Sequence, residues 1–215
     1  MEVIGDYRAD GYAHVRGLIP AEVARAFMRG IKEDMGPQPI QLSNITQHPQ
    51  QLRRPTAQIY GANHKPMSYF LWGLTPTISQ LVGKDLLPTY DYFRIYREGD
   101  ICRVHSDRPS CEHSVSLTLD YSDGEVWNLQ VAKEKTAPAL EMADDFGSAP
   151  YSSVAMEIGD AVIYEGVYHR HGRITPNPNG WSAHLFLHFV DRNGPFAEFA
   201  FDKKVDLSPV NFTFA

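Results

Sequence analysis

The chain has 215 residues, of which 43% are hydrophobic and 12% aromatic, enough for one globular domain with a sizeable core but cramped for two. Its net charge of -6 disfavours electrostatic binding to nucleic-acid phosphates, so no nucleic-acid partner is expected. No stretch approaches the roughly 18 apolar residues of a membrane span, and the N-terminus lacks the basic start and apolar run of a signal peptide. We therefore expect a cytoplasmic protein with no membrane partner, whose Cys102 and Cys111 are reduced thiols.

The first part of the chain predicts a strand and an amphipathic helix. Residues 11–19 alternate enough to indicate a short strand. Over residues 20–35, apolar side chains recur every four residues, which predicts a helix with Pro20 at its first position. The members of this apolar stripe are Val23, Ala24, Phe27, Met28, Ile31 and Met35.

A loop and a second helix are predicted next. Residues 36–66 are rich in Pro, Gln and Asn, and this composition indicates an ordered loop or lid. Apolar residues return at 67–74. A short second helix is then predicted, with Thr75 as its cap, Pro76 at its start and Gly83 at its end.

From Leu87 onward the chain consists mostly of predicted strands, which alternate polar and apolar residues and are rich in aromatic side chains. The strand segments are 88–96, 100–107, 113–121, 125–133, 152–166, 169–175 and 181–190. A loop is predicted over 136–150. Two helices followed by about eight short strands indicate a mainly β fold with flanking helices, either a helix-buttressed barrel or a double-sheet jelly roll.

A single domain over residues 1–215 is expected. Its parts are a helical support with a lid loop at 1–86, a barrel core at 87–192 and a C-terminal tail at 193–215. The tail is expected to pack on the barrel or on a partner, so both a monomer and a homodimer stay open. Its phenylalanines are Phe196, Phe199, Phe201, Phe212 and Phe214.

A histidine and an aspartate stand two positions apart in RVHSDRP, residues 103–109. Residues two apart on a strand point to the same side, so His105 and Asp107 can direct two ligands at one point. Two histidines and a carboxylate on one face of a metal leave positions open, which suits non-haem Fe(II). The alternative is a core histidine and a turn-capping aspartate before Pro109. Candidates for a third ligand are His169, His171, His184 and His188, whereas the contexts of His14, His48, His64 and His113 indicate surface or loop positions.

Several blocks of this sequence resemble the 2-oxoglutarate- and Fe(II)-dependent oxygenases, particularly the prolyl-hydroxylase-like branch and a bacterial and phage group within the superfamily. The blocks are YREGDICRVHSD, HSDRPSCEHSVSLTLDY, and GDAVIYEGVYHRHGR followed by WSAHLFLHFVD. The likeness runs from about residue 87 to 203 and more loosely to the N-terminus. It implies a double-stranded β-helix fold of jelly-roll or cupin-like type, Fe(II) as the metal, 2-oxoglutarate and O2 as cosubstrates, and ascorbate as an optional further cofactor.

The resemblance also selects the third metal ligand. In that group a histidine follows the glycine of the I-Y-x-G block by five residues, which points from Gly166 to His171, with His169 in reserve. The chain departs from the group's pattern at Gly172, where tryptophan is usual, and by an extra residue before WSAHLFLHF. The implied catalytic and metal-binding residues are His105, Asp107 and His171.

The distal carboxylate of 2-oxoglutarate needs a cation and a hydroxyl group, because a buried unpaired charge is costly. Arg173 lies two residues past His171 and should share its face, and a guanidinium fits a carboxylate with two hydrogen bonds. The last strand offers no Lys or Arg before Arg192, so Arg173 is favoured, with His184 as its helper.

Further cosubstrate contacts are predicted on two other strands. Tyr96 occupies the tyrosine position of the Y-x-x-G block, where relatives bond the cosubstrate, and Arg94 shares its strand face. Thr118 lies on the strand after the H-x-D turn and offers a hydroxyl. The alternative for each is structural, because strand tyrosines are usually core residues and arginines usually lie at a solvated rim.

Substrate contacts are assigned to Arg108, Glu112 and Trp181. Arg108 and Glu112 flank the turn beside the metal, although they could instead pair with each other as a structural clip. Arg53 and Arg54 in the long loop could close over an anionic substrate or form a solvated pair.

The activity that the resemblance implies is that of a 2-oxoglutarate-dependent non-haem iron dioxygenase. It would hydroxylate an unactivated C–H bond of a small metabolite or amino acid and release succinate and CO2. Desaturation and other oxidative outcomes stay open, while the presence of Asp107 argues against halogenation. The alternatives are a non-catalytic or isomerase-type cupin-like metal-binding module, a degenerate oxygenase kept as a scaffold, and a peptidyl-prolyl hydroxylase.

Overall fold

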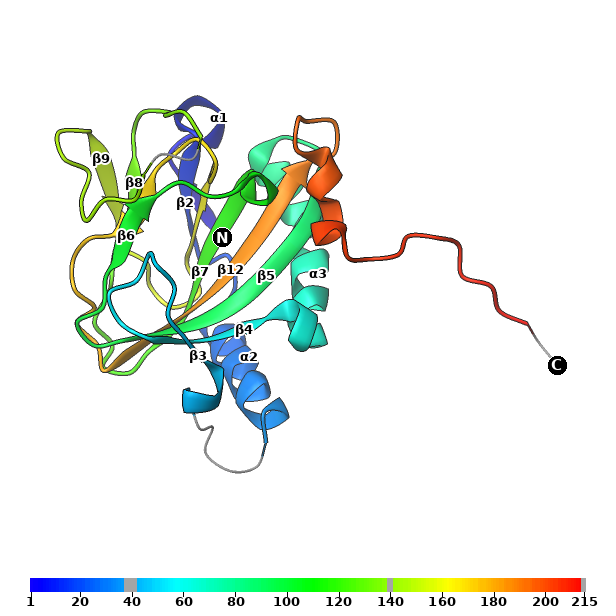
Figure 1. Ribbon diagram of the computed structural model, residues 1–215, viewed down its shortest axis with the longest axis horizontal. Helices are drawn as coiled ribbons and strands as arrows, with labels where there is room; N and C mark the ends of the chain where they lie inside the picture. The colour runs from blue at the N-terminus through cyan, green and yellow to red at the C-terminus, as the bar shows by residue number, and fades with distance from the viewer. Residues whose placement is uncertain (37–41, 139–140, 214–215) are drawn as a thin grey trace.

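Two antiparallel β-sheets form the body of the protein in the computed structural model, which describes residues 1–36, 42–138 and 141–213 (Figure 1). In spatial order the large sheet consists of β1 (Glu2–Ile4), β2 (Tyr12–Arg16), β10 (Ala161–Tyr164), β7 (His113–Tyr121), β12 (Trp181–Asp191), β5 (Leu86–Arg97), β4 (Thr56–Tyr60) and β3 (Thr46–Gln47). The small sheet consists of β6 (Cys102–His105), β11 (His171–Arg173), β8 (Leu129–Ala132) and β9 (Tyr151–Val154). The predicted mainly β, double-stranded β-helix architecture is confirmed.

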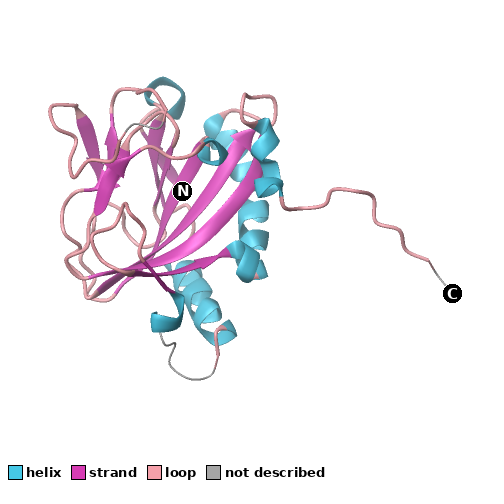
Figure 2. Cartoon of the chain, in the orientation of Figure 1, coloured by secondary structure: helices cyan, strands magenta, loops and turns pink. Residues whose placement is uncertain are grey.

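Helices lie against one side of the large sheet (Figure 2). The α-helices are α1 (Tyr7–Asp10), α2 (Ala21–Asp34) and α3 (Lys65–Val82), and short 3-10 helices occur at η1 (Leu42–Ile45), η2 (Gly61–Asn63), η3 (Pro109–Cys111) and η4 (Ala197–Lys203). α2 contacts β7, and α3 contacts β5. No helix in the described part of the chain is long and apolar enough to cross a membrane.

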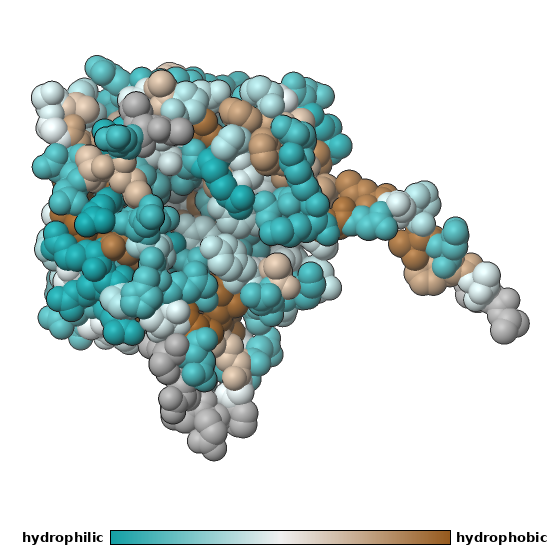
Figure 3. Space-filling view, in the orientation of Figure 1, coloured by the Kyte–Doolittle hydropathy of each residue, from teal (hydrophilic) through white to brown (hydrophobic). Residues whose placement is uncertain are grey.

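The C-terminal end of the chain runs away from this body. Figure 3 shows it as a narrow extension with hydrophobic side chains on its surface. Phe196, Phe199 and Phe201 are half-buried against the body, but Phe212 is 84% exposed, and Phe214 lies outside the described residues. The predicted packing of the tail therefore holds for its first part, up to η4.

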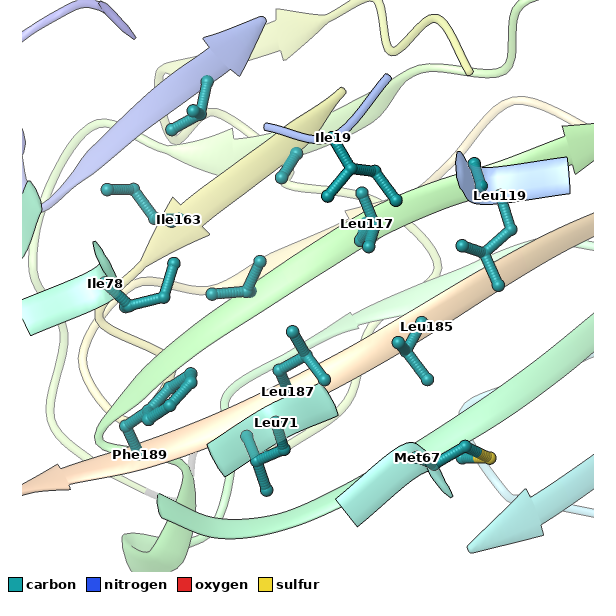
Figure 4. Close-up of a cluster of buried hydrophobic side chains, with 14 of the residues drawn as sticks. Ile19, Met67, Leu71, Ile78, Leu117, Leu119, Ile163, Leu185, Leu187 and Phe189 are labelled. Carbon is teal, nitrogen blue, oxygen red and sulfur yellow. The ribbon is translucent and has the colours of Figure 1, made fainter. Parts of the chain in front are cut away.

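The hydrophobic core lies between the large sheet and its helices. Figure 4 shows Leu117 and Leu119 of β7 beside Leu185, Leu187 and Phe189 of β12, with Met67, Leu71 and Ile78 of α3 packed over them. Each fully buried side chain of this kind stabilises the fold by about 1.5–3 kcal/mol. Because strand side chains alternate between faces, the intervening residues of β7 and β12 point between the two sheets, and this is where the polar side chains collect.

The predicted helix at 20–35 forms as α2, with Pro20 as its N-cap residue. Its buried face is narrower than the apolar stripe, since Ala24 and Ile31 are buried while Val23 is 44% exposed.

Three features of the N-terminal half differ from the sequence prediction. β1 and α1 were not expected. β4 lies inside the predicted loop and pairs with β5, so the segment 1–86 contributes strands to the barrel as well as support. α3 is one continuous helix through Pro76, and Thr75 does not cap it but donates its hydroxyl proton to the Leu71 carbonyl.

Candidate metal centre

Three potential metal ligands come together at one end of the β6–β11 pair in the small sheet: His105, Asp107 and His171. His105 ends β6, and it lies directly opposite His171, the first residue of β11. Asp107 follows β6, and its backbone N–H donates to the Gly166 carbonyl at 2.8 Å. Asp107 Oδ1 lies 3.7 Å from His105 Nε2 and 3.6 Å from His171 Nε2. One ligand atom from each residue fits within a 4.8 Å cluster, which is the spacing that a single metal ion requires.

Backbone carbonyls set the direction of both imidazoles. His105 Nδ1 lies 2.7 Å from the Arg103 carbonyl, and His171 Nδ1 lies 3.0 Å from the His169 carbonyl. Because a carbonyl only accepts hydrogen bonds, Nδ1 carries a proton in each ring, which leaves Nε2 as the nitrogen that would bind a metal once it has lost its own proton. These contacts give the two rings the tautomer that binds a metal through Nε2.

The third member of this cluster, Asp107, is ionised. Its burial acts to raise the pKa, but His171 and His105 outweigh that effect and hold the pKa of this carboxyl well below its usual range. Its other oxygen, Oδ2, lies 3.0 Å from the Ser114 hydroxyl, which also lies 2.9 Å from His188 Nδ1. Ser114 was not singled out in the sequence, although its place on the inward face of an alternating strand was readable.

The other late histidines do not join this centre. His169 precedes β11 in a bend, its Nδ1 donates to the Ala132 carbonyl, and its Nε2 packs against Gly11. His184 contacts Arg173. His188 stacks on Tyr90 at 4.6 Å and forms, with Cys111, a second potential ligand group that shares Asp107 with the first. His113, expected at the surface, is buried and bonds the Tyr7 hydroxyl.

Two cavities meet at the metal centre. The outer one has a volume of about 1100 Å³ and lies between α3, β5 and η4, whereas the inner one holds only about 20 Å³ and runs between the sheets. Both are lined by Tyr92, Arg94, His105 and Asp107. A ligand that enters the inner cavity must therefore displace side chains, and a ligand in the outer cavity lies next to the same metal position.

Two buried arginines line the inner cavity, and neither forms an ion pair with an acidic residue among the described residues. Arg94 on β5 donates from Nε to Gln58 Oε1 at 2.7 Å and from Nη1 to the Tyr96 hydroxyl at 3.2 Å. Arg173 donates to the Trp127 carbonyl, and its Nη2 lies 3.3 Å from His184 Nδ1. Two buried cations without a counter-ion are costly, so this cavity suits an anionic ligand.

The remaining predicted cosubstrate residues lie at different depths. Tyr96 lines the inner cavity and packs edge-on against Trp127. His184 lies behind Arg173, and burial, reinforced by Arg173, lowers its pKa well below the usual value, so it is neutral. Thr118 is fully buried on β7 opposite His184, but it lines neither cavity.

Of the predicted substrate residues, only Arg108 lines the outer cavity. Its guanidinium lies over the Tyr90 ring at 4.3 Å and forms an ion pair with Asp202 at 3.3 Å. Glu112 is buried at the end of η3, where its carboxylate accepts a hydrogen bond from the Asp191 N–H; it does not line the outer cavity and does not pair with Arg108. Trp181 packs against the hydrophobic core on the helix side and does not line the outer cavity.

Neither loop arginine faces the outer cavity. The backbone N–H groups of Arg53 and Arg54 donate to Asp100 Oδ1 and anchor this part of the loop.

A buried acid on β5, Asp91, lines the outer cavity with one carboxylate oxygen unsatisfied. It is 2% exposed and packs against Gly61, and its Oδ2 has no hydrogen-bond partner among the described residues. Burial raises the pKa of this carboxyl from 3.8 to about 7. The folded protein therefore keeps this proton up to neutral pH, whereas the unfolded chain loses it near pH 4.

We expect the Asp91→Asn variant to be stabilised relative to the parent as pH rises. Between the two pKa values the folded state binds the proton and the unfolded state does not, so the parent loses stability with rising pH. The stability difference between variant and parent should be about 2–3 kcal/mol more favourable at pH 8 than at pH 5. Urea denaturation at both pH values measures it, with the exposed Asp10→Asn as control. An equal difference at the two pH values would contradict a raised pKa.

Comparisons with known proteins support this geometry at the level of fold. No protein-family model matches the chain, and no curated protein matches its sequence. Many solved structures resemble it, among them SnoN, HygX and a prolyl-4-hydroxylase. The epimerase SnoN, in complex with Fe3+, alpha ketoglutarate and nogalamycin RO, is 14% identical, with 95% of this chain and 90% of that chain covered and a TM-score of 0.64. HygX from Streptomyces hygroscopicus, with nickel, 2-oxoglutarate and hygromycin B bound, is 13% identical, with 87% and 85% covered and a TM-score of 0.63.

A prolyl-4-hydroxylase from Pseudomonas putida is 16% identical, with 87% of this chain and 96% of that chain covered and a TM-score of 0.57. At these identities the shared property is the fold. The chain has the double-stranded β-helix of the 2-oxoglutarate/Fe(II)-dependent oxygenases, prolyl-hydroxylase-like members included, as the sequence resemblance implied.

Proposed function

We propose that this protein is an Fe(II)- and 2-oxoglutarate-dependent dioxygenase that hydroxylates an unactivated C–H bond of a small molecule. The observation that carries the proposal is the juxtaposition of two features. A two-histidine, one-carboxylate set points its ligand atoms at one spot, and that spot opens onto an inner cavity holding two arginines without acidic partners among the described residues.

The donor set fits Fe(II). Two neutral imidazole nitrogens and one carboxylate on one face are the arrangement that non-haem iron oxygenases use, and a closed structural zinc site would need a fourth protein ligand. Cys102 and Cys111 are both buried and unpaired, and neither belongs to this triad. His105, Asp107 and His171 would therefore hold the metal on one side and leave its other side to the cavities.

The inner cavity fits 2-oxoglutarate by charge. The dianion would bring negative charge to a cavity in which the cations of Arg94 and Arg173 have no acidic partner among the described residues. When bound, iron with this cosubstrate and O2 supplies the oxidising chemistry that converts a C–H bond to C–OH and releases succinate and CO2. The protein's own part is to orient both imidazoles through their Nδ1–H groups, to neutralise the cosubstrate and to exclude water between the sheets.

The substrate would bind in the outer cavity. Its volume exceeds what a free amino acid fills and lies at the upper end of small-molecule sites. A metabolite larger than a free amino acid therefore fits this cavity better. HygX and SnoN, with hygromycin B and nogalamycin RO in their structures, are consistent with a substrate of that size class.

Anaerobic addition of Fe(II) and then 2-oxoglutarate tests the proposal. We expect a weak visible charge-transfer band, followed by succinate release when O2 is admitted. Stimulation of that release above the uncoupled background by one compound of a metabolite and peptide panel would identify the substrate class. Iron binding with neither a band nor succinate would instead support the cupin-like metal-binding module.

A further inference from the structure

The backbone of η4 is strained where it reaches the outer cavity. Phe201, Asp202 and Lys203 have φ values of 53°, 52° and 55°, three consecutive left-handed residues, none of which is glycine. The left-handed region is unfavourable for L-residues because Cβ approaches the carbonyl oxygen, and runs of it are rare. Such a conformation persists only where surrounding contacts impose it, and it is commonly found at functional sites.

Side-chain contacts hold each of the three residues. Phe201 meets the Trp72 ring of α3 edge-on at 6.4 Å. Asp202 is only 13% exposed and pairs with Arg108 as well as with Lys204. On the outer side, Lys203 pairs with Glu198 at 2.8 Å.

The strained residues belong to a segment that walls the outer cavity. We call residues 197–206 the C-terminal strap; it contacts β5, β12 and η3. Phe201 and Asp202 line the cavity together with Trp72, whereas Lys203 does not. Figure 1 shows the strap beside the ends of β5 and β12, at the point where the tail leaves the body.

The Arg108–Asp202 ion pair, which we call the latch, is adjacent to the metal centre. Arg108 follows the ligand Asp107 directly in sequence, and its guanidinium lies over the ring of Tyr90, which stacks on His188. Asp202 therefore fixes the strap to the same turn that presents a metal ligand.

We propose that the C-terminal strap closes the outer cavity over the substrate, and that Asp202 is the positioning residue that keeps it closed through Arg108. The role of the cavity as substrate site rests on the proposed function. Phe201 then forms an aromatic wall with Trp72, which favours substrates with a ring or another apolar face on that side. Release of the latch lets the left-handed residues relax and opens the wall.

Hydrogen–deuterium exchange of the metal-free full chain tests the latch without depending on iron or 2-oxoglutarate. Asp202→Asn keeps the side-chain shape and tolerates the left-handed backbone, so only the charge is lost. We expect strap amides such as those of Phe199 and Lys204 to exchange about fivefold faster, and acrylamide to quench Trp72 more strongly. Arg108→Gln should do the same. Glu198→Gln, which breaks the outer ion pair, is the matched control and should leave Trp72 quenching unchanged.

A variant that keeps the charge of the latch makes the test informative if Asp202→Asn folds poorly. Arg108→Lys, which keeps a positive charge for Asp202, should leave exchange near the parent rate. Once a stimulating substrate is known, Asp202→Asn should raise the KM for that substrate and leave both kcat and the KM for the cosubstrate within about twofold. The proposed closure would be refuted if amide exchange were unchanged in both single variants, or if Glu198→Gln accelerated exchange in the strap as much as they do. If the latch variants accelerate exchange in the strap but the protein forms no iron–2-oxoglutarate complex, the latch stands and only the proposed function is refuted.

Discussion

Replacing His171 with alanine should abolish the Fe(II)–2-oxoglutarate band, whereas replacing His169 should leave it intact. His171 lies opposite His105 across the β6–β11 pair, and its Nε2 is 3.6 Å from Asp107 Oδ1. His169 is equally buried, but its Nδ1 is engaged by the Ala132 carbonyl, and its Nε2 points at Gly11. Removal of one of three protein ligands should lower succinate release by at least about 100-fold, because supporting residues alone cost 10- to 100-fold.

Asp107→Ala should match His171→Ala, since it removes both a ligand and the only negative charge of the triad. Thermal unfolding of the metal-free proteins is the control. If the band were lost only because removal of a buried histidine impairs folding, His169→Ala would show the same fall in melting temperature as His171→Ala. A band that survives in His171→Ala and is lost in His169→Ala would move the third ligand to His169. A band that survives in all three variants would place the metal elsewhere.

The long strands were the most predictable part of this fold. β7 and β5 are 9 and 12 residues long, and the alternation of polar and apolar residues in the sequence predicted a strand over most of each. β4 is only five residues long and lies in a segment rich in Pro and Gln, and it becomes a strand because β5 offers it an edge. α3 passes through Pro76 because packing on the sheet outweighs the local preference to start a new helix there.

The metal ligands were readable in part. The two-residue spacing of His105 and Asp107 follows from strand geometry, but the choice between His169 and His171 could not come from periodicity, because both have the same parity. What separates them is that β11 begins at His171 and that His169 stands in the preceding bend. The position of Glu112 could not be predicted for a similar reason: at the end of a 3-10 turn, no strand alternation predicts the direction of its side chain.

Contacts between segments distant in sequence were not readable at all. The approach of Asp202 to Arg108 joins positions 94 residues apart, and that of Ser114 to His188 joins positions 74 apart. Sequence alone also favoured Arg173 over Arg94 for the cosubstrate, because Arg173 follows the metal ligand. The structure shows that both guanidinium groups reach the inner cavity, so the choice depends on which one has hydrogen-bonding capacity to spare.

That comparison favours Arg94 as the anchor for the distal carboxylate of 2-oxoglutarate. Arg173 uses both terminal nitrogens within the protein, on the Trp127 carbonyl, Met156 Sδ and His184. Arg94 uses Nε and Nη1, and its Nη2 donates to no described residue, although Arg94 lines both cavities. We expect Arg94→Met to raise the KM for the cosubstrate about 30-fold or more, since truncating one partner of a buried charge pair costs about 2–5 kcal/mol.

An analogue separates this role from a structural one. 2-Oxovalerate lacks the distal carboxylate, so the parent should discriminate strongly against it, while Arg94→Met should treat the two oxoacids almost alike. Arg94→Met should also leave the melting temperature of the ligand-free protein unchanged or raised, because it removes a buried cation that has no acidic partner among the described residues. Arg173→Met should instead lower the melting temperature, through loss of the Trp127 and His184 contacts, with a smaller change in KM. The reverse pattern, with discrimination lost only in Arg173→Met, would return the anchor to Arg173 and make Arg94 a strand residue that orders Tyr96.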